Sequence, residues 1–265
     1  MHYKIVFSDI DGTLLNSEHK ITPLTEYAIK ELQKLDIPFV IISARSPSGI
    51  YPIVNDYNIK CPIISYSGAL ILDENNNVLF HKGIKKESAN EIINFIEKKH
   101  FDMTWGIYSF DQWIVKNKKD PRIINEETIV KAYSTQGDIN SITGNEVHKI
   151  LCICNPDKIL DIENLLKINF PDYSIAKSSD ILLEIMEKNI TKATAVNTMC
   201  SLLNINISDT IAFGDNYNDL EMLQTAGRGF LMENAPVELK AKVKLHTADN
   251  DHDGIYYALK KTGIL

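Results

Sequence analysis

Two aspartates follow the first apolar segment of the chain, at the point where a strand is expected to end. Residues 3–8 form a short apolar run, and Asp9-Ile10-Asp11-Gly12-Thr13 comes directly after it. Ligands of open parallel sheets bind beyond the carboxyl ends of the strands, so these carboxylates are well placed for chemistry. One carboxylate can attack an electrophile or bind a metal ion while the other transfers a proton. The alternative for this pentapeptide alone is a helix cap or a turn.

A second acidic group follows another apolar run near the C-terminus. Residues 210–213 are followed by Gly214-Asp215-Asn216-Tyr217-Asn218-Asp219. If the two strands are neighbours, Asp9, Asp11, Asp215 and Asp219 converge, and such a group repels itself unless a cation is bound. Oxygen ligands of this kind suit a hard divalent ion, most simply Mg²⁺. The alternative for the hexapeptide alone is an acidic helix N-terminus.

Two further segments are suited to binding an anionic oxygen. Ser43-Ala44-Arg45 ends a second apolar run, where a hydroxyl and a backbone N–H at a strand-to-helix turn favour phosphate. Lys192 lies at the start of a predicted helix, where its charge opposes the macrodipole, so a nearby anion explains it better than solvent does. Arg45 is either a substrate contact or a structural ion-pair partner.

The elements that must position these residues alternate between strands and helices at both ends of the chain. Thr22-Pro23 predicts a helix start with threonine as the N-cap, and Leu24, Ala28, Leu32 and Leu35 recur at helical spacing. Residues 38–43 and 62–66 read as buried strands, which with the crossover helices predict a parallel sheet. Residues 69–72 and 78–81 flank three asparagines and predict a hairpin, and residues 230–232 and 243–245 predict edge strands.

The middle of the chain has a different pattern, in which predicted hairpins mix with helices. We therefore expect an α/β protein with a Rossmann-like parallel-sheet core at residues 1–82 and 188–265. Residues 83–187 are expected to form an inserted α+β domain. Trp105, Tyr108, Trp113 and His148 lie in this insert, and the sequence leaves open which of them contacts a ligand.

Composition excludes several classes of protein. The chain has 265 residues, of which 44% are hydrophobic and 24% are charged, as in ordinary globular proteins. Its longest apolar runs are far shorter than the roughly 20 residues of a membrane-spanning helix, and the N-terminus lacks the pattern of a signal peptide. The formal net charge of −7 disfavours nucleic acid and anionic membranes as partners. The four cysteines suggest buried thiols in a reducing, cytoplasmic compartment; a metal site at Cys152 and Cys154 would have only His148 nearby as a further ligand.

Taken together, these motifs resemble the haloacid dehalogenase-like (HAD) hydrolase superfamily, and within it the Cof-type, sugar-phosphatase-like family. The resemblance is carried by Asp9–Thr13, the strand-end Ser43, Lys192 and Gly214–Asp219, in that order. About 30 residues separate Thr13 from Ser43 and about 150 separate Ser43 from Lys192, which places the large cap between the second and third motifs. The chain departs from the family where Ser43-Ala44-Arg45 replaces Thr-Gly-Arg and Ser67-Gly68-Ala69 replaces Asn-Gly-Ala.

The resemblance implies an Mg²⁺-dependent phosphatase that acts on a small phosphorylated metabolite, such as a sugar phosphate. Asp9 is then the nucleophile that forms an aspartyl-phosphate, and Asp11 is the general acid and base. Asp9, Asp11 and Asp215 would hold the metal, and Asp219 would orient a metal-bound water or Lys192. The phosphate would be bound by Ser43, Ala44, Lys192 and Asn218, and Arg45 is a possible substrate contact.

Other functions fit parts of the same pattern. A phosphotransferase or mutase on the same core would replace water by a sugar hydroxyl. A non-catalytic phosphate-binding module has no need of Asp11, and a haloacid dehalogenase has no need of a metal-binding pair. A receiver domain also groups aspartates around Mg²⁺, but it is about half this length and has no long insert.

Overall fold

A computed structural model describes residues 3–265 and divides the chain into two compact units. The first consists of Met1–Ala44, Tyr51–Phe80 and Thr191–Leu265, and the second of Arg45–Ile50 and His81–Ile190. Within residues 3–265, no helix combines the length and the apolar character that crossing a bilayer requires.

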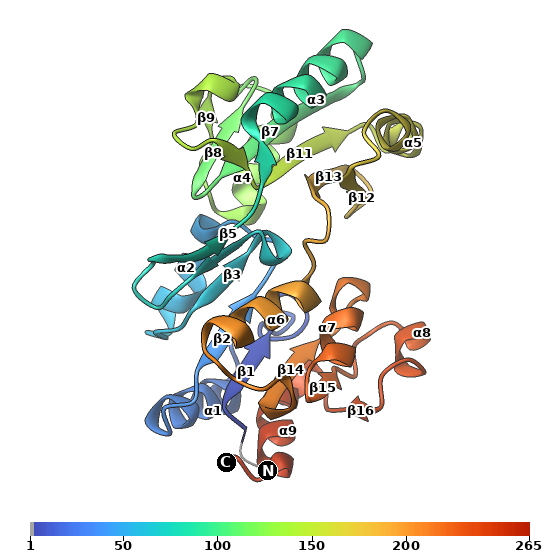
Figure 1. Ribbon diagram of the computed structural model, residues 1–265. Coiled ribbons are helices and arrows are strands. Elements are labelled where there is room, and N and C mark those ends of the chain that lie inside the picture. Colours follow the sequence, from blue (N-terminus) through green and yellow to red (C-terminus); the bar gives the residue numbers. More distant parts are fainter. Residues whose placement is uncertain (1–2) are drawn as a thin grey trace. The chain divides into compact units, whose positions relative to one another are not determined.

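The first unit contains an eight-stranded sheet, ordered β16-β15-β14-β1-β2-β3-β4-β5 (Figure 1). The pairs from β16 to β3 are parallel, and β4 runs antiparallel to β3. The strands are β1 (Ile5–Ser8), β2 (Phe39–Ile42), β3 (Ile63–Ser65), β4 (Leu70–Leu72), β5 (Val78–His81), β14 (Thr210–Gly214), β15 (Arg228–Leu231) and β16 (Leu245–His246). The predicted α/β class with a parallel-sheet core is confirmed.

Helices pack on this sheet because its strands are apolar on both faces. Every residue of β1, β2 and β14 is buried, as expected for parallel strands covered on two sides. Residues of α6 and α7 join one hydrophobic cluster with β1, β2 and β14, while α1 contacts α9 and β2. The helices are α1 (Pro23–Lys34), α2 (Pro47–Asp56), α6 (Lys192–Leu202), α7 (Leu220–Thr225), α8 (Val237–Lys240) and α9 (Gly254–Thr262). Of α2, residues 51–56 belong to the first unit and residues 47–50 to the second.

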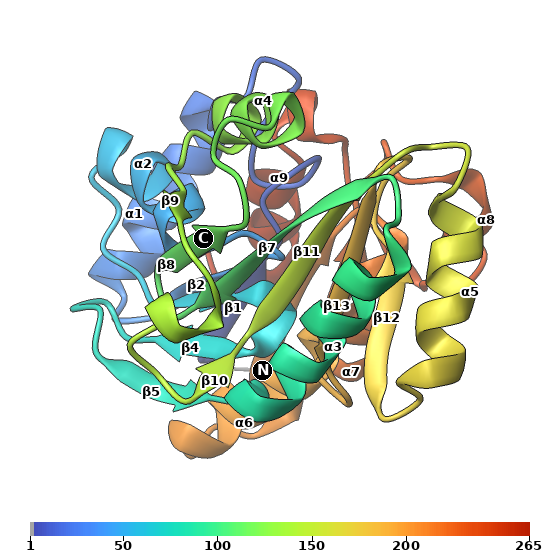
Figure 2. The same ribbon diagram turned by 90° about the horizontal axis from the view of Figure 1, so that it is seen from above.

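The second unit is built on a six-stranded sheet, ordered β12-β13-β11-β7-β8-β9, and a two-stranded pair of β10 and β6. Its strands are β6 (Ile84–Lys85), β7 (Met103–Ser109), β8 (Gln112–Val115), β9 (Thr135–Gln136), β10 (Glu146–Val147), β11 (Lys149–Cys154), β12 (Tyr173–Lys177) and β13 (Leu182–Glu187). Its helices are α3 (Lys86–Lys99), α4 (Pro121–Val130) and α5 (Ile159–Asn169). In Figure 2, α3 crosses this sheet, and residues of α3 and α5 share one apolar core with it.

Some local predictions are wrong in detail. Thr22 precedes α1, but its buried hydroxyl caps no backbone N–H, so the predicted threonine cap is wrong. Of the two predicted start signals, only the proline at the first helical position is present. Ala28 and Leu32 are buried, whereas Leu24 and Leu35 are exposed, because α1 turns Thr25 and Ile29 inward instead.

The two strands predicted at the sheet edge also differ from each other. The predicted strand at residues 230–232 corresponds to β15, which lies inside the sheet between β14 and β16. Of these two predicted strands, the second corresponds to β16, which lies at an edge of the sheet. The predicted hairpin is present as β4 and β5, whose turn is held by Asp73, since its carboxylate accepts from the N–H groups of Asn75 and Asn77.

Candidate active site

Three neighbouring parallel strands end at the same edge of the first unit's sheet, and each is followed by a predicted site residue. Asp9 follows β1, Ser43 follows β2 and Asp215 follows β14. Ser8 pairs with Phe213 and with Ile41, and the N–H of Asp9 donates to the Phe213 carbonyl at 3.1 Å. The strand pairing therefore brings segments about 200 residues apart in sequence to one point.

Lys192 is the cation of this site. It is the first residue of α6, whose N-terminus is capped by the Thr191 hydroxyl. The Lys192 Nζ contacts Asp9 Oδ1 at 2.5 Å and Asp219 Oδ1 at 2.6 Å, and only 1% of the residue is exposed. A lysine so deeply buried needs charged partners, and these two carboxylates supply them.

Three carboxylates lie around Lys192. One oxygen each from Asp9, Asp215 and Asp219 lie within 4.8 Å of one another. Burial raises the pKa of Asp9 to about 7; Lys192 opposes this shift, while the charges of Asp219 and Asp215 add to it. Burial also raises the pKa of Asp215 to about 6, although a hydrogen bond from Thr13 acts against the rise. The site therefore carries more negative charge than Lys192 neutralises.

Asp219 and Asp215 are held by the loop after β14. Oδ2 of Asp219 accepts from the N–H groups of Asp215 and Asn216, at 3.1 Å and 3.0 Å. Oδ1 of Asp215 accepts from the Thr13 hydroxyl at 2.8 Å. Asp219 is fully buried and contacts Lys192, so it supports the site from behind rather than facing solvent.

Gly12 is required by the closeness of two loops. Its φ is +79°, and a Cβ there would lie 2.3 Å from Asp215 Oδ2. Any side chain at this position would collide with the carboxylate and strain the backbone. Glycine at this point of the motif therefore lets the turn after β1 approach the turn after β14.

The remaining predicted residues lie at different depths. Asp11 is exposed, and its carboxylate is not part of the group formed by the other three aspartates. Ser43 is buried, Ala44 is half-buried, and Asn218 is exposed in the short turn Tyr217–Asp219. The structure thus brings three of the four predicted carboxylates together.

Arg45 belongs to the second compact unit. Its Nη1 donates to the carbonyl of Gly49, 3.3 Å away, within the first turn of α2. This bond provides a structural role for the guanidinium, and a substrate contact stays a prediction.

The geometry suits a divalent cation. All the charged donors are carboxylate oxygens, which magnesium prefers over nitrogen or sulfur ligands. Burial is the main cause of the raised pKa values of Asp9 and Asp215, and the neighbouring carboxylates add to it; a bound cation would offset this repulsion. The residues present therefore fit Mg²⁺.

Two supporting residues had no predicted role. Thr13 is buried and donates to Asp215. Asn234 donates from Nδ2 to the Gly12 carbonyl at 2.8 Å, which ties the turn after β1 to the loop after β15. The position of Thr13 in the Asp9–Thr13 motif was the available signal, but only the pairing of β14 with β1 and with β15 shows what the two residues contact.

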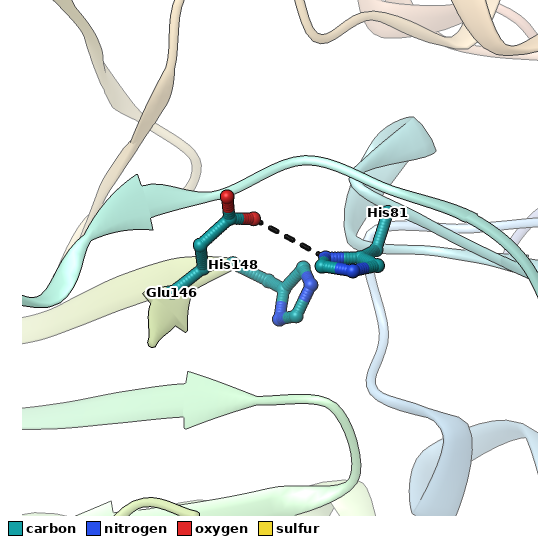
Figure 3. A group of neighbouring side chains, drawn as sticks. All are labelled: His81, Glu146 and His148. Atoms are coloured by element: carbon teal, nitrogen blue, oxygen red, sulfur yellow. Dashed lines mark hydrogen bonds and ion pairs between the residues drawn. The ribbon is translucent and has the colours of Figure 1, made fainter. Parts of the chain in front are cut away.

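A second cluster, His81, Glu146 and His148, lies within the second unit (Figure 3). Nδ1 of His81 lies 3.2 Å from Glu146 Oε2, and the Phe110 N–H donates to His148 Nδ1 at 3.0 Å. The neutral His148 ring therefore carries its proton on Nε2, whereas a histidine that binds metal through Nε2 needs its proton on Nδ1. Burial, together with His81, lowers the pKa of His148 to about 4, so the ring stays neutral. The arrangement does not favour a metal ion.

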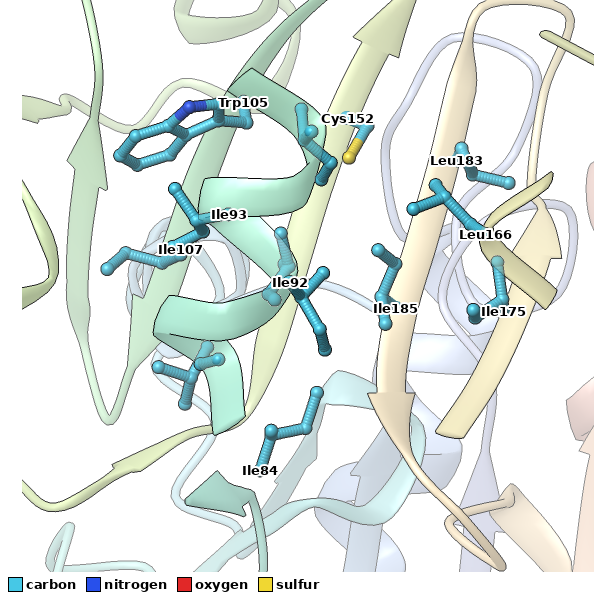
Figure 4. Packing of buried hydrophobic residues seen from close by; sticks show 14 of the residues in the cluster. Ile84, Ile92, Ile93, Trp105, Ile107, Cys152, Leu166, Ile175, Leu183 and Ile185 are labelled. Carbon is cyan, nitrogen blue, oxygen red and sulfur yellow. The ribbon is translucent and has the colours of Figure 1, made fainter. Parts of the chain in front are cut away.

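Cys152 and Cys154 are core thiols. Both belong to the second unit's hydrophobic cluster (Figure 4), and burial raises their pKa values. Their environment agrees with the prediction that the cysteines are buried thiols.

Comparison with known proteins identifies the family. Residues 6–259 match the haloacid dehalogenase-like hydrolases. The chain belongs to this family. A Haemophilus influenzae protein named "Putative phosphatase" is 37% identical over 261 residues, which cover 98% of both chains. "Putative phosphatase YkrA" of Bacillus subtilis is 27% identical over 265 residues and 100% of both chains.

A solved structure shows the same fold. A haloacid dehalogenase-like hydrolase from Bacteroides thetaiotaomicron superposes with a TM-score of 0.89 at 26% identity, covering 98% of this chain and 99% of that chain. The resemblance found in the sequence motifs is confirmed, and the family and these relatives support a phosphatase.

Proposed function

We propose that the protein hydrolyses a small phosphorylated metabolite, such as a sugar phosphate, in an Mg²⁺-dependent reaction through an aspartyl-phosphate. The observation that carries this proposal is the position of Asp9. It lies at a strand end, bonded to the buried Lys192 and beside Asp215 and Asp219. A carboxylate held next to one cation and a potential metal site can approach a phosphate dianion that bare carboxylates would repel.

The reaction proceeds in two displacements. A carboxylate oxygen of Asp9 forms a bond to phosphorus as the ester P–O bond breaks, and Asp11 gives its proton to the leaving oxygen. Water then attacks the same phosphorus, its proton goes to Asp11, and the bond between phosphorus and Asp9 breaks. Asp11 is exposed and can exchange protons with solvent, which suits a group that must do both.

The other residues stabilise the phosphoryl group as it transfers. Lys192 supplies a fixed positive charge, and the Ser43 hydroxyl, the Ala44 N–H and the Asn218 amide are hydrogen-bond donors for its oxygens. Bound Mg²⁺, held by Asp9, Asp215 and the backbone carbonyl of Asp11, would supply Lewis-acid neutralisation of phosphate charge. Asp219 positions Lys192 through their contact at 2.6 Å.

The inserted residues 83–187 are proposed as a cap that determines substrate specificity. The division rests on the two compact units, of which the first contains Asp9, Asp11, Lys192 and Asp215. Phosphate chemistry would then be common to all substrates, and selection among leaving groups would depend on the insert.

The test measures hydrolysis of p-nitrophenyl phosphate by the full-length protein with Mg²⁺, with EDTA, and with Mg²⁺ restored. Asp9→Asn keeps nearly the same shape but removes the nucleophile, and Asp36→Asn, at an exposed position of the same unit, is the matched control. We expect activity only with Mg²⁺, loss in Asp9→Asn and retention in Asp36→Asn. Full activity of metal-free protein would refute the metal assignment, and full activity of Asp9→Asn would refute the nucleophile.

A further inference from the structure

The turn after β3 has a costly backbone conformation. Tyr66, Ser67 and Gly68 have φ angles of +51°, +54° and +122° in succession. A positive φ is uncommon outside glycine, and for a bulky aromatic residue it is a genuine outlier. The residue before the turn adds to the cost, because within residues 3–265 the buried Ser65 hydroxyl has no hydrogen-bond partner. The local sequence therefore does not favour this turn, and contacts with other elements of the first unit must hold it.

One set of contacts joins the turn to the end of β2. The Ser67 N–H donates to the Ser43 carbonyl at 2.8 Å, and the Ser43 N–H donates to the Ile64 carbonyl at 2.9 Å. The side chain of Tyr66 is fully buried, which fixes the first residue of the turn. The backbone of the predicted phosphate-binding Ser43 is thus bonded on both sides to β3 and its turn.

A second set of contacts joins the turn to the start of α6. A Cβ at Gly68 would lie 2.8 Å from the Cβ of Ala195 and 3.1 Å from the carbonyl oxygen of Thr191. Thr191 caps α6, and its carbonyl accepts from the Ala195 N–H at 3.0 Å, so both contacts fall on the first turn of the helix. Glycine is required here twice over, for its φ and for the lack of space.

The start of α6 is where Lys192 lies. Its Nζ is 2.5 Å from Asp9 Oδ1 and 2.6 Å from Asp219 Oδ1, and these carboxylates belong to other elements. Hydrogen bonds weaken steeply beyond about 3.2 Å, so moving the helix start away by about 1 Å would break both contacts. The lysine is almost completely buried and has little room to follow by changing its rotamer. The position of Nζ therefore depends on how closely α6 approaches the sheet.

Close packing alone would explain a small residue at position 68. It does not explain why Tyr66 and Ser67 also adopt a left-handed backbone, which relaxed residues avoid. Strain of this kind persists where surrounding contacts impose it, and it is concentrated at functional sites.

We propose that the Tyr66–Gly68 turn is a positioning element of the active site. Gly68 sets how closely the start of α6 approaches the sheet edge, and it thereby holds Lys192 against Asp9. Gly68 is a positioning residue, because it acts through Lys192 and not on the substrate. The effect on turnover rests on the proposed phosphatase function, whereas the effect on Lys192 does not.

A double-mutant cycle tests the effect on Lys192 without any activity. Gly68→Ala places a methyl group against the first turn of α6. If this moves Nζ away from its carboxylates, Lys192→Met should destabilise the Gly68→Ala protein by at most about half as much as it destabilises wild type, in urea denaturation of metal-free full-length protein at pH 8. Gly263→Ala is the control, since φ there is +75° but a Cβ would meet nothing within 4 Å, and Lys192→Met should keep its full effect in that background. An equal effect of Lys192→Met in all three backgrounds overturns the proposal.

A second variant approaches the contact from the helix and leaves the backbone of the turn unchanged, so it serves even if Gly68→Ala does not fold. Ala195→Val enlarges the side chain that faces Gly68, and Ala193→Val is the matched control, because residues two apart on a helix do not share a face.

We expect Ala195→Val to lower kcat/KM by about tenfold or more, and by the same factor for p-nitrophenyl phosphate and an alkyl phosphate, because Lys192 acts on the phosphoryl group that both share. Ala193→Val should leave both rates close to wild type. Equal rates in the two variants contradict the proposal. If the wild-type protein hydrolyses neither ester, the phosphatase function fails, and the double-mutant cycle still decides whether Gly68 positions Lys192.

Discussion

Replacing Lys192 by methionine tests how the buried charges of the candidate active site depend on one another. Methionine preserves much of the volume of the side chain but leaves Asp9 and Asp219 without their cation. In the wild-type protein, Lys192 Nζ lies 2.5 Å from Asp9 Oδ1 and 2.6 Å from Asp219 Oδ1. Removing one partner from a buried ion pair typically costs about 3–5 kcal/mol. We expect a loss of this size in the free energy of unfolding of metal-free protein at pH 8.

The loss should depend on pH, with a sign set by the raised pKa values. Asp9 has a pKa of about 7 in the folded protein, above its ordinary value of 3.8, so the folded state binds more protons than the unfolded state between these values. Stability of metal-free protein therefore falls as the pH rises through this interval. At pH 5 both Asp9 and Asp215 are largely protonated, and a missing lysine charge costs less.

Urea denaturation of metal-free protein at pH 5 and pH 8 measures this difference. Lys30→Met is the control, because Lys30 is exposed and paired with Glu26, and exposed i,i+4 pairs of this kind contribute about 0.3–0.5 kcal/mol. A loss below about 1 kcal/mol for Lys192→Met at pH 8, or an equal loss at both pH values, would show that the three carboxylates do not depend on Lys192.

Three further predictions concern the same site. Mg²⁺ should raise the melting temperature more at pH 8 than at pH 5, because protonated Asp9 and Asp215 bind it poorly; calorimetry that showed equal shifts would contradict their role as ligands. Asp11→Asn should slow hydrolysis of an alkyl phosphate by roughly 10²–10⁴-fold and slow hydrolysis of p-nitrophenyl phosphate less. An equal fold decrease with the two substrates would exclude Asp11 as the acid. Gly12→Ala should abolish Mg²⁺ binding in titration calorimetry. Gly263→Ala is the control: φ there is also positive, +75°, but a Cβ would meet no other atom within 4 Å, so this variant should lose only about 1 kcal/mol of stability through backbone strain. Normal Mg²⁺ affinity in Gly12→Ala would refute the steric argument.

The sequence predicted the core because its signals are local. The apolar runs that became β1, β2 and β14 are buried along their whole length, and polar residues follow each of them directly. That Asp9 and Asp215 lie together depends on β1 pairing with β14, about 200 residues away. No local pattern contains this pairing, and the order of the family motifs supplied it.

Other features could not be read from the sequence because they depend on three-dimensional packing. Asp11 is two residues from Asp9, yet it is exposed and its carboxylate lies outside the group formed by Asp9, Asp215 and Asp219. Trp105 and Trp113 are indistinguishable as tryptophans in predicted strands. Only the register of β7 and β8 shows that one joins the apolar core and the other stacks on Tyr108.

Chemical trapping of the phosphorylated residue tests the central claim most directly. Full-length protein with Mg²⁺ is mixed with an excess of substrate, quenched during turnover and reduced with borohydride, which converts an aspartyl-phosphate to homoserine. Peptide mass spectrometry then locates the change. The proposed mechanism predicts homoserine at position 9 and none at position 11 or at position 215. Homoserine at another residue, or none at position 9 in protein that is turning over, would contradict Asp9 as the nucleophile.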